Sequence, residues 1–371
     1  MENYIVSARK YRPQTFETVV GQRSIVMTLK NAIRTNQVAQ AFLFCGSRGV
    51  GKTSTARILA KTINCTNRTL DIEACDQCPS CLSFNEGSSL NIYELDAASN
   101  NSVDDIRSLI DQVRIAPQLG THKVYIIDEV HMLSTNAFNA FLKTLEEPPK
   151  HAIFILATTE KHKIIPTILS RCQIFDFSRI RVNDIAQHLS NIALKEGIQT
   201  EPEALHLIAQ KSDGALRDSL SIFDQLVIFT QGNISYAAVL DNLNVLDYDY
   251  FFKVVEFAEN RDIPSALVLF NNIMDKGFDG HNFLLGLSSH YRNILVSKDP
   301  ATVVLLELAE AISQRYVEQG SKVDTQRILR SIQVVQKAES EYKGSKNQRL
   351  LVEWTLMQLC SLNEESEKKN G

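Results

Sequence analysis

Residues 46–53 of the chain read GSRGVGKT, and this stretch decides the fold. It matches in full the pattern G-x-x-x-x-G-K-[ST], follows an apolar run at 41–45, and opens a helical pattern whose inner face includes Ala56, Leu59, Ala60 and Ile63. In that context the glycines let backbone N–H groups converge on phosphate oxygens at a helix N-terminus. Lys52 brings a positive charge to the outer phosphates, and the Thr53 hydroxyl is placed to ligate Mg²⁺. The sequence therefore predicts a nucleoside triphosphate site, against the alternative of a plain glycine turn beside a lysine.

A second motif supplies the acidic partner of this loop. Residues 124–129 read VYIIDE, an apolar strand that ends in two acids. Asp128 is expected near the metal, and Glu129 is expected to polarise the water that attacks the γ-phosphate. Acids at a strand end also serve as solubilising caps, but here they accompany a complete phosphate loop. Residues 128–131 also spell DEVH, as in certain helicases, although His131 is equally well read as a packing residue.

The first half of the chain alternates apolar runs with helical patterns. Strands are expected at 41–45, 92–95, 124–127, 153–157 and 174–177, and an amphipathic helix at 137–145 ends before two prolines. Such apolar strands favour a parallel sheet covered by helices on both faces, which is a doubly wound α/β domain. From about residue 181 onward only helical patterns are present. The expected divisions are an α/β domain at 1–181 with an insert at about 64–84, a helical domain at 182–244, a second helical domain at 245–363, and a solvated tail at 364–371.

Size and charge narrow the classes of function. The 371 residues are enough for two or three domains, and the formal net charge is −4. A nucleic-acid-binding protein that relies on a wholly basic surface has a different charge balance, so any such contact must be local. The start of the chain has no signal-peptide pattern, and no stretch is apolar enough to span a bilayer. We therefore expect a cytoplasmic protein without membrane contact.

Four of the seven cysteines gather in the expected insert. Their spacing is C-x9-C-x2-C-x2-C, and the ligands are Cys65, Cys75, Cys78 and Cys81. In a cytosolic protein such a cluster favours metal over disulfides. Four thiolates close a tetrahedral Zn²⁺ site without an open position for catalysis, so we expect a structural zinc. A [4Fe–4S] cluster uses the same ligands and is the main alternative, ahead of cysteines that bind no metal.

Several further motifs resemble one family. They are KYRP at 10–13, VGQ at 20–22, FNAFLKTLEEPP at 138–149, SRC at 170–172 and GALRD at 214–218. Together with the phosphate loop they are similar to the clamp-loader ATPases of the AAA+ class, and the four-cysteine insert is especially similar to the gamma/tau family of bacterial DNA polymerase III. The resemblance is dense over residues 1–225 and thinner beyond, where NQRLLVE at 347–353 is the main match.

The resemblance implies roles for individual residues. Arg171 would act in trans on the γ-phosphate bound by a neighbouring subunit, Arg217 would contact the phosphates in cis, and Thr159 would sense the attacking water, although a strand-end threonine is commonly only a cap. The expected catalytic set is Glu129, Lys52, Arg171 and Thr159. The expected ATP contacts are Tyr11, Arg12, Pro13, Val20, Gly46, Arg48, Gly49, Val50, Gly51, Lys52, Thr53, Ser54, Asp128, Leu216 and Arg217, with Thr53 and Asp128 also on Mg²⁺.

The segment at 96–105 has two interpretations. Ser99, Asn100 or Ser102 is suited to cap the helix that follows. In the resembling family such helix starts track the phosphates of primed template DNA, but Asn100 stands where relatives often carry a basic residue. Arg107 and Lys143 are the alternative contacts.

The function implied is an ATP-driven subunit that opens a sliding clamp and loads it onto primed DNA. The implied partners are delta, delta prime and further gamma/tau copies, the sliding clamp and primed template DNA, all within the nucleoid-associated replisome, with the second helical domain as an oligomerisation collar. Polymerase core and helicase are implied only for a chain with a longer tail. A silent scaffold subunit conflicts with the complete ATPase motifs. An unrelated AAA+ motor for branch migration or remodelling conflicts with the cysteine insert and the third domain.

Overall fold

The computed structural model describes residues 5–117, 120–306 and 308–362 of the chain. The tail expected at 364–371 lies outside these residues. The chain divides into two compact units, which are described separately. The first comprises Met1–Gly197 and Ile208–Ile228, and the second comprises Ile198–Leu207 and Phe229–Gly371.

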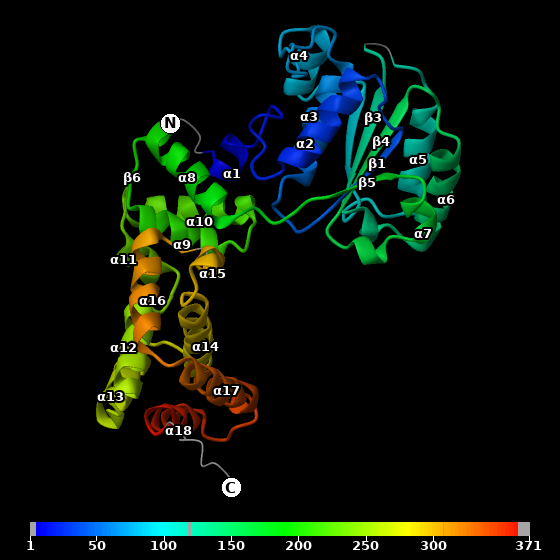
Figure 1. Ribbon diagram of the computed structural model, residues 1–371. Coiled ribbons are helices and arrows are strands. Elements are labelled where there is room, and N and C mark those ends of the chain that lie inside the picture. The colour runs from blue at the N-terminus through cyan, green and yellow to red at the C-terminus, as the bar shows by residue number, and fades with distance from the viewer. Residues whose placement is uncertain (1–4, 118–119, 307, 363–371) are drawn as a thin grey trace. The chain divides into compact units, whose positions relative to one another are not determined.

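A five-stranded parallel sheet forms the centre of the first unit, as the apolar runs predicted (Figure 1). Its order is β2-β3-β4-β1-β5, so the strand before the phosphate loop lies between β4 and β5. The central strands β1, β3 and β4 are buried almost throughout, whereas the edge strands β2 and β5 alternate with exposed positions. The bounds are β1 Ala41–Cys45, β2 Ile92–Asp96, β3 Lys123–Asp128, β4 Ala152–Thr158 and β5 Gln173–Asp176.

Helices cover both faces of this sheet, because successive side chains of a strand point to opposite sides. On one face Phe42 and Phe44 of β1 pack with α2 and α3. On the other face Leu43 packs with α5, α6 and α7. Figure 1 shows α2 and α3 on one side of the sheet and α5 and α6 on the other. These helices are α2 Arg23–Arg34, α3 Lys52–Asn64, α5 Val103–Val113, α6 Thr135–Glu146 and α7 Pro166–Leu169.

Local signals explain where these helices begin and end. Ser102 caps α5 through a capping box with Asp105, so the capping interpretation of this segment is confirmed. Ser134 caps α6 by accepting the N–H of Ala137, and the helix stops before the two prolines as expected. The remaining elements of the first unit are α1 Ser7–Lys10, α4 Pro79–Asn85, the short 3₁₀ turns η1 Val130–Met132 and η2 Lys161–Lys163, α8 Val182–Glu196 and α10 Leu216–Phe229.

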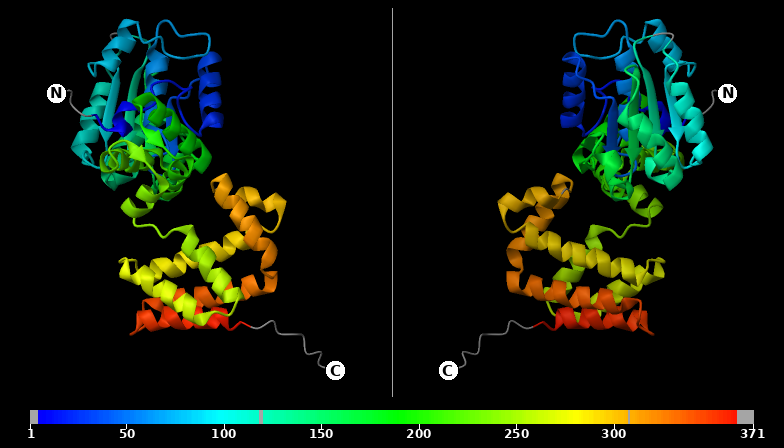
Figure 2. Two further views of the ribbon diagram at one scale, coloured as in Figure 1. Left: turned by 90° about the vertical axis from the view of Figure 1, so that its left-hand side faces the viewer. Right: turned by 90° about the vertical axis from the view of Figure 1, so that its right-hand side faces the viewer.

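The second unit is helical around one apolar core. Figure 2 shows its helices from two sides. A two-stranded parallel sheet of β6 Gln199–Thr200 and β7 Asn233–Ile234 accompanies the helices. This sheet corrects the expectation of helices alone after residue 181; strands of two residues are too short to produce an alternating pattern. The helices are α11 Tyr236–Asn242, α12 Tyr248–Glu259, α13 Ile263–Asp275, α14 Gly280–Val296, α15 Pro300–Val303, η3 Val304–Leu306, α16 Glu310–Lys322, α17 Thr325–Tyr342 and α18 Gln348–Cys360, while α9 Pro202–Lys211 contributes residues to both units.

A buried histidine lies inside the core of the second unit. His290 of α14 is 1% exposed, with Nδ1 2.7 Å from the hydroxyl of Tyr316 and Nε2 3.1 Å from Oε1 of Gln319. The amide nitrogen of Gln319 donates to the carbonyl of Phe252, which leaves its oxygen to accept from His290. Nε2 therefore carries the proton, and Nδ1 accepts from the tyrosine hydroxyl. Burial lowers the pKa of His290 to about 3.

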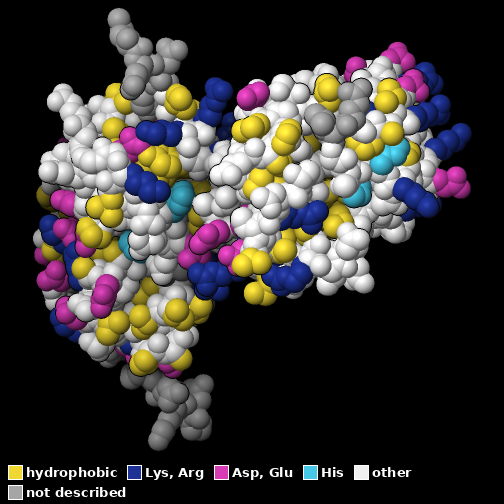
Figure 3. Space-filling model, turned by 90° about the horizontal axis from the view of Figure 1, so that it is seen from above, with side chains coloured by type: hydrophobic (Ala, Val, Ile, Leu, Met, Phe, Trp, Pro, Cys, Tyr) yellow, Lys and Arg dark blue, Asp and Glu magenta, His cyan; other side chains and the backbone are white. Residues whose placement is uncertain are grey.

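The surface is mixed in charge, in keeping with the net charge of −4. Figure 3 shows basic and acidic side chains interspersed with apolar ones on the face that it views. Among the described residues, no helix combines the length and the apolar character that crossing a membrane requires.

Candidate functional site

A cavity of about 840 Å³ lies in the first unit, where the phosphate loop meets the N-terminal segment and the start of α10. Most of the residues expected to contact nucleotide line it, together with Glu129, the expected catalytic acid. They are Tyr11, Arg12, Pro13, Val20, Arg48, Gly49, Val50, Gly51, Lys52, Thr53, Ser54, Asp128, Glu129, Leu216 and Arg217. Gly46, Thr159 and Arg171 are not among the lining residues. The structure thus assembles segments far apart in the sequence around one cavity.

The phosphate loop takes backbone conformations that favour glycine. Gly51, at φ 102°, is the N-cap of α3, and Gly46 has φ 145°. A Cβ at position 46 would stand 2.5 Å from the carbonyl oxygen of Phe177, so this position also excludes a side chain by contact. The loop therefore ends at the N-terminus of α3, where backbone N–H groups and the helix dipole favour an anion.

Gly49 is the point where the loop touches the start of α10. Its φ is 78°, and a Cβ there would stand 3.1 Å from the Cβ of Ala215 and 3.3 Å from that of Arg217. Such spacings are tighter than ordinary van der Waals contacts. Glycine at position 49 allows the loop and the GALRD segment to approach each other this closely.

The ammonium of Lys52 is directed at the loop itself. Lys52 is 5% exposed, and its Nζ donates to the carbonyls of Gly46, at 2.7 Å, and Ser47, at 2.9 Å. Burial lowers the pKa of Lys52, and the nearby carboxylates of Glu129 and Asp128 oppose that shift. The side chain is thus a desolvated cation on the inner surface of the loop.

The hydroxyl of Thr53 and the carboxylate of Asp128 meet directly. Thr53 Oγ1 donates to Asp128 Oδ2 over 2.7 Å. One residue opens α3 and the other ends β3, so the fold brings together two oxygen ligands from separate motifs. Mg²⁺ prefers oxygen ligands of this kind and is commonly held by one or two carboxylates together with phosphate oxygens. The pair therefore fits the expected magnesium site.

Glu129 follows β3 in a left-handed backbone conformation. Its φ of 48° lies in the left-handed region, which is uncommon for a residue with a side chain. Its Oε2 accepts from both the backbone N–H of Thr159, at 3.2 Å, and the hydroxyl of Thr159, at 2.9 Å. The structure thus pairs the expected catalytic acid with the expected sensor.

His131 completes this cluster. Its side chain is 5% exposed, with Nδ1 2.9 Å from the hydroxyl of Thr158 and 3.4 Å from Glu129 Oε2, while Nε2 lies 3.4 Å from Glu160 Oε1. Its side chain is buried and hydrogen-bonded, as the packing interpretation expected, and it also lies beside Glu129, the expected catalytic acid.

The cavity is also lined by apolar residues. Sequence reasoning identified Pro13, Val20 and Leu216 among them. It missed eight lining residues: Val6, Ala8, Arg9, Val19, Asp96, Ala98, Ile180 and Leu220. Val19 had the clearest local signal, since it directly precedes the VGQ motif at 20–22. Ile180 and Leu220 lack a local signal, because they reach the cavity only through the turn after β5 and the first turns of α10.

The N-terminal segment is fastened to α8 and α10 within the same unit. The backbone N–H of Ser7 donates to Asp224 Oδ2 over 2.7 Å, and Lys10 Nζ pairs with Glu196 at 2.5 Å. Tyr11 donates to the same glutamate. Deeper in the cavity, Arg12 Nε lies 3.3 Å from Ser54 Oγ, and burial lowers the pKa of this arginine. These contacts keep the KYRP motif against the phosphate loop.

Arg171 lies apart from the cavity of its own chain. It is exposed, its Nη1 donates to the carbonyl of Thr167 over 2.7 Å, and its Nη2 pairs with Glu146 at 2.8 Å. This placement agrees with a role outside the cavity of its own chain. The contacts of Arg171 with Thr167 and Glu146 do not by themselves show what that role is.

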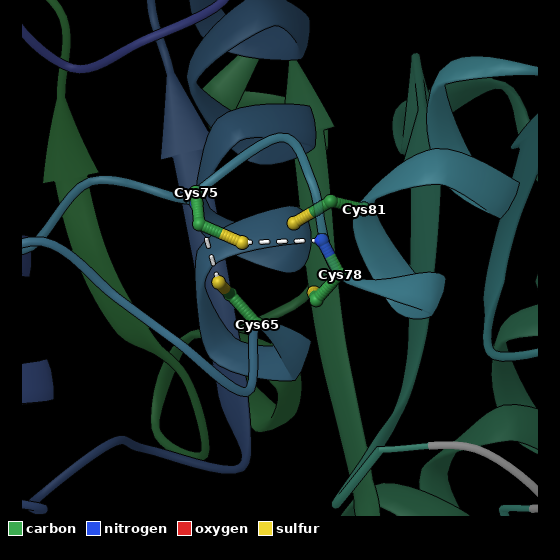
Figure 4. A group of neighbouring side chains, drawn as sticks. All are labelled: Cys65, Cys75, Cys78 and Cys81. Carbon is green, nitrogen blue, oxygen red and sulfur yellow. Dashed lines mark hydrogen bonds between the residues drawn. The ribbon is translucent and has the colours of Figure 1, made fainter.

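The four cysteines of the insert come together beyond the end of α3 (Figure 4). Their Sγ atoms all lie within 4.8 Å of one another. The backbone N–H groups of Cys75 and Cys78 donate to Cys65 Sγ and Cys75 Sγ, each over 3.3 Å. A hydrogen bond from the backbone of Gln77 lowers the pKa of Cys75, whereas burial raises that of Cys81. Four converging sulfurs fit a closed tetrahedral metal site, with zinc as the ion that such a donor set favours.

Three family descriptions match successive parts of the chain. "DNA polymerase III, delta subunit" matches residues 21–181, "DNA polymerase III clamp loader subunit, ATPase lid domain" matches 184–232, and "DNA polymerase III subunits gamma and tau domain III" matches 234–370. Together these matches leave only the first twenty or so residues and short joints uncovered.

Curated relatives match over nearly the whole chain. The DNA polymerase III subunit gamma of Buchnera aphidicola subsp. Baizongia pistaciae is 36% identical over 97% of this chain and 98% of its own length. The subunit tau of Bacillus subtilis is 39% identical over 98% of this chain, which spans 64% of that relative's length. Among solved structures, the Thermotoga maritima RuvB Holliday junction branch migration motor is 18% identical, with a TM-score of 0.49, over 67% of this chain and 78% of that one.

Proposed function

The chain belongs to the gamma/tau family of DNA polymerase III, and from that premise we propose that it is an ATP-binding and ATP-hydrolysing subunit of a clamp loader. ATP binding and hydrolysis by this subunit would open a sliding clamp and load it onto primed template DNA during chromosomal replication. Its partners would be delta, delta prime and further gamma/tau copies, and it would work in the cytoplasm with the replisome.

One observation carries the proposal of ATP hydrolysis. A complete phosphate loop, a metal-binding pair and a held carboxylate face one cavity, through Lys52, Thr53, Asp128 and Glu129. A protein that only binds nucleotide needs the loop but has no use for a base held at a fixed place. The combination supports a hydrolytic site.

The residues of the chain divide the work as follows. Lys52 and the N–H groups of the loop bind the phosphates, and Arg217 adds a cation from α10. Thr53 and Asp128 would hold Mg²⁺, which when bound neutralises charge on the phosphate oxygens. Glu129 orients and deprotonates the attacking water while Thr159 fixes its carboxylate.

Arg171 would complete the site of a neighbouring subunit. A guanidinium at the γ-phosphate stabilises the charge that develops during transfer and typically accelerates hydrolysis by about 10³–10⁵-fold. Its exposure and its distance from the cavity lining support a role in trans. The pairing with Glu146 would keep the side chain ordered until a subunit docks.

The remaining parts are proposed to have structural roles. The domain divisions would be 1–181, 182–244 and 245–363, with the last as the collar that joins subunits. The four cysteines would hold a structural Zn²⁺, because a site closed by four sulfurs has no position for a substrate.

The deciding experiment measures ATP turnover by the assembled complex with and without sliding clamp and primed DNA. We expect stimulation that requires both, and Lys52→Ala should abolish both nucleotide binding and turnover. A chain that hydrolyses ATP equally fast alone, or is stimulated by branched DNA in place of clamp and primer, would point to a different motor. Retained ATP affinity in the Lys52 variant would refute the assigned phosphate site.

A further inference from the structure

Two carboxylates inside the cysteine insert contact segments that shape the nucleotide cavity. We call residues 65–81 the metal loop, since its ends and middle carry the four cysteines. Glu73 and Asp76 lie within this loop. Both carry carboxylates and stand outside the set of four cysteine ligands. Their partners lie outside the loop, in the N-terminal segment and on α2 and α3.

Glu73 binds the backbone of the N-terminal segment. Its Oε2 accepts the N–H of Phe16 over 2.9 Å, and its Oε1 accepts the N–H of Glu17 over 3.2 Å. The same oxygen pairs with Lys30 Nζ of α2 at 2.7 Å, and the glutamate side chain is only 13% exposed. The ammonium of Lys30 also lies 5.8 Å from the ring centre of Phe16. Carboxylate bonds to backbone N–H and to ammonium groups are among the stronger hydrogen bonds in proteins.

The segment that Glu73 holds is continuous with the cavity wall. Pro13 precedes the two bonded amides and Val19 follows them, and both line the cavity. Phe16 itself is 1% exposed in the core of the first unit. The carboxylate therefore fixes the middle of a short stretch whose two ends contact the expected nucleotide.

Asp76 contacts the helix of the phosphate loop in the same way. Its Oδ1 pairs with Lys61 Nζ at 2.6 Å, and the side chain of Lys61 is 3% exposed. Asn85 of α4 donates to the same oxygen over 3.1 Å. Lys61 belongs to α3, the helix that begins with Lys52 and Thr53. A buried lysine with one carboxylate partner depends on that partner remaining in place.

The position of both acids depends on the shape of the metal loop. Glu73 precedes Cys75 by two residues, and Asp76 follows it directly in a left-handed conformation with φ 54°. A turn at Thr69, whose hydroxyl accepts the N–H of Glu73, supports the first of them. A loop of this length has no core of its own beyond the cysteines and Ala74. A metal that joins four sulfurs would therefore fix Glu73 and Asp76 as well.

We propose that the metal loop positions the nucleotide cavity: with its metal bound, Glu73 and Asp76 hold the 13–19 stretch and α3 in place, and loss of the metal weakens nucleotide binding. This inference rests on the nucleotide site proposed above. Glu73 acts through Phe16 and Glu17 and is thus a positioning residue. The metal loop becomes a place where metal withdrawal changes ATP affinity.

The test measures binding of a fluorescent ATP analogue to the full chain, together with metal content. Glu73→Gln keeps one acceptor oxygen, loses the charge and leaves all four cysteines, so we expect affinity to fall about tenfold with the metal retained. Asp76→Asn should give a smaller loss, and metal-stripped protein a larger one. Lys30→Met removes the ion pair and leaves the backbone bonds, and Glu86→Gln, at an exposed residue just beyond the insert, is the matched control.

The turnover readout separates positioning from a loss of folding. In the assembled complex we expect a raised KM for ATP with kcat changed less than twofold, because Glu73 does not touch the reacting atoms. Metal-loaded Glu73→Gln and Asp76→Asn proteins that bind the analogue as tightly as the parent would overturn the inference, as would a metal-stripped, folded chain of parental affinity. Failure of the parent chain to bind the analogue would instead refute the proposed function.

Discussion

The carboxylate of Glu129 accepts two hydrogen bonds from one residue, Thr159, which donates through both its backbone N–H and its hydroxyl. Glu129 follows β3, and Thr159 follows the neighbouring strand β4. Because parallel strands end at the same edge of the sheet, this pairing is a direct result of the topology. Two hydrogen bonds to one oxygen restrict the orientation of the carboxylate.

The Thr159 hydroxyl can be removed without changing the shape of the side chain. Thr159→Val keeps the backbone bond and loses the hydroxyl bond, so we expect kcat to fall about tenfold to a hundredfold. ATP affinity should stay within about twofold, since Thr159 does not line the cavity. Steady-state turnover of the assembled complex, with analogue binding in parallel, checks this. Unchanged kcat would remove Thr159 from the catalytic set.

Arg171 is predicted to matter only where subunits adjoin. Arg171→Ala should leave ATP binding intact and lower turnover of the assembled complex by about 10³-fold or more, because transition-state charge loses its partner. Glu146→Gln removes the residue that pairs with Arg171 within the chain and should retain most turnover. Single-turnover hydrolysis in complexes that mix parent and variant subunits would show which site fails. Loss in the variant's own site alone would contradict a role in trans.

The metal site predicts about one zinc per chain by elemental analysis. Cys81→Ser should lower that content to near zero and lower the melting temperature, because a structural metal adds its binding free energy to folding. Cys172→Ser, outside the cluster, is the matched control and should keep the metal. Purified protein that is folded and free of metal would end the proposal, and visible absorbance with bound iron would favour the iron–sulfur alternative.

His290 predicts a pH dependence of stability in the second unit. Its folded pKa of about 3 lies below the unfolded value near 6.5. Between these values the unfolded chain binds the extra proton, so stability is present above about pH 6.5 and is lost as pH falls. At pH 5 the loss is about 2 kcal/mol. The chain's single tryptophan, Trp354 of α18, reports unfolding of this unit by fluorescence.

Replacing the histidine isolates its contribution. His290→Gln removes the titrating group, so the free energy of unfolding should vary less with pH between 5 and 6.5, by about one proton in slope. The comparison with the parent matters because burial also lowers the pKa of His206 in α9. If the free energy of unfolding had the same pH slope in parent and variant, the pKa of His290 would be the same in the folded and the unfolded chain, which would contradict this prediction.

Much of the first unit follows from short-range patterns. The strands β1 to β5 are runs of apolar residues, and the phosphate loop and the acids after β3 are local motifs that predict their own surroundings. The five-stranded parallel sheet and the grouping of these motifs at one cavity are confirmed. Helix α5 begins at the capping residue Ser102, and α6 ends before the two prolines, as expected.

The remaining features depend on contacts between distant segments. Glu73 holds the backbone of Phe16 and Glu17 by bonds that no local pattern encodes. Ile180 and Leu220 reach the cavity only because the chain folds back after β5. The strands β6 and β7 are two residues each, too short for periodicity. The role given to Arg171 needs a second subunit and stays a prediction.

The absence of a side chain at Gly49 has a mechanical consequence. A methyl group added at position 49 would stand 3.1 Å from the Cβ of Ala215 and 3.3 Å from that of Arg217, so these neighbours would have to move by a few tenths of an ångström. Well-packed protein interiors accommodate such shifts poorly, and the φ of 78° adds backbone strain for any residue with a Cβ. Even an alanine at position 49 would therefore separate the phosphate loop from the first turn of α10.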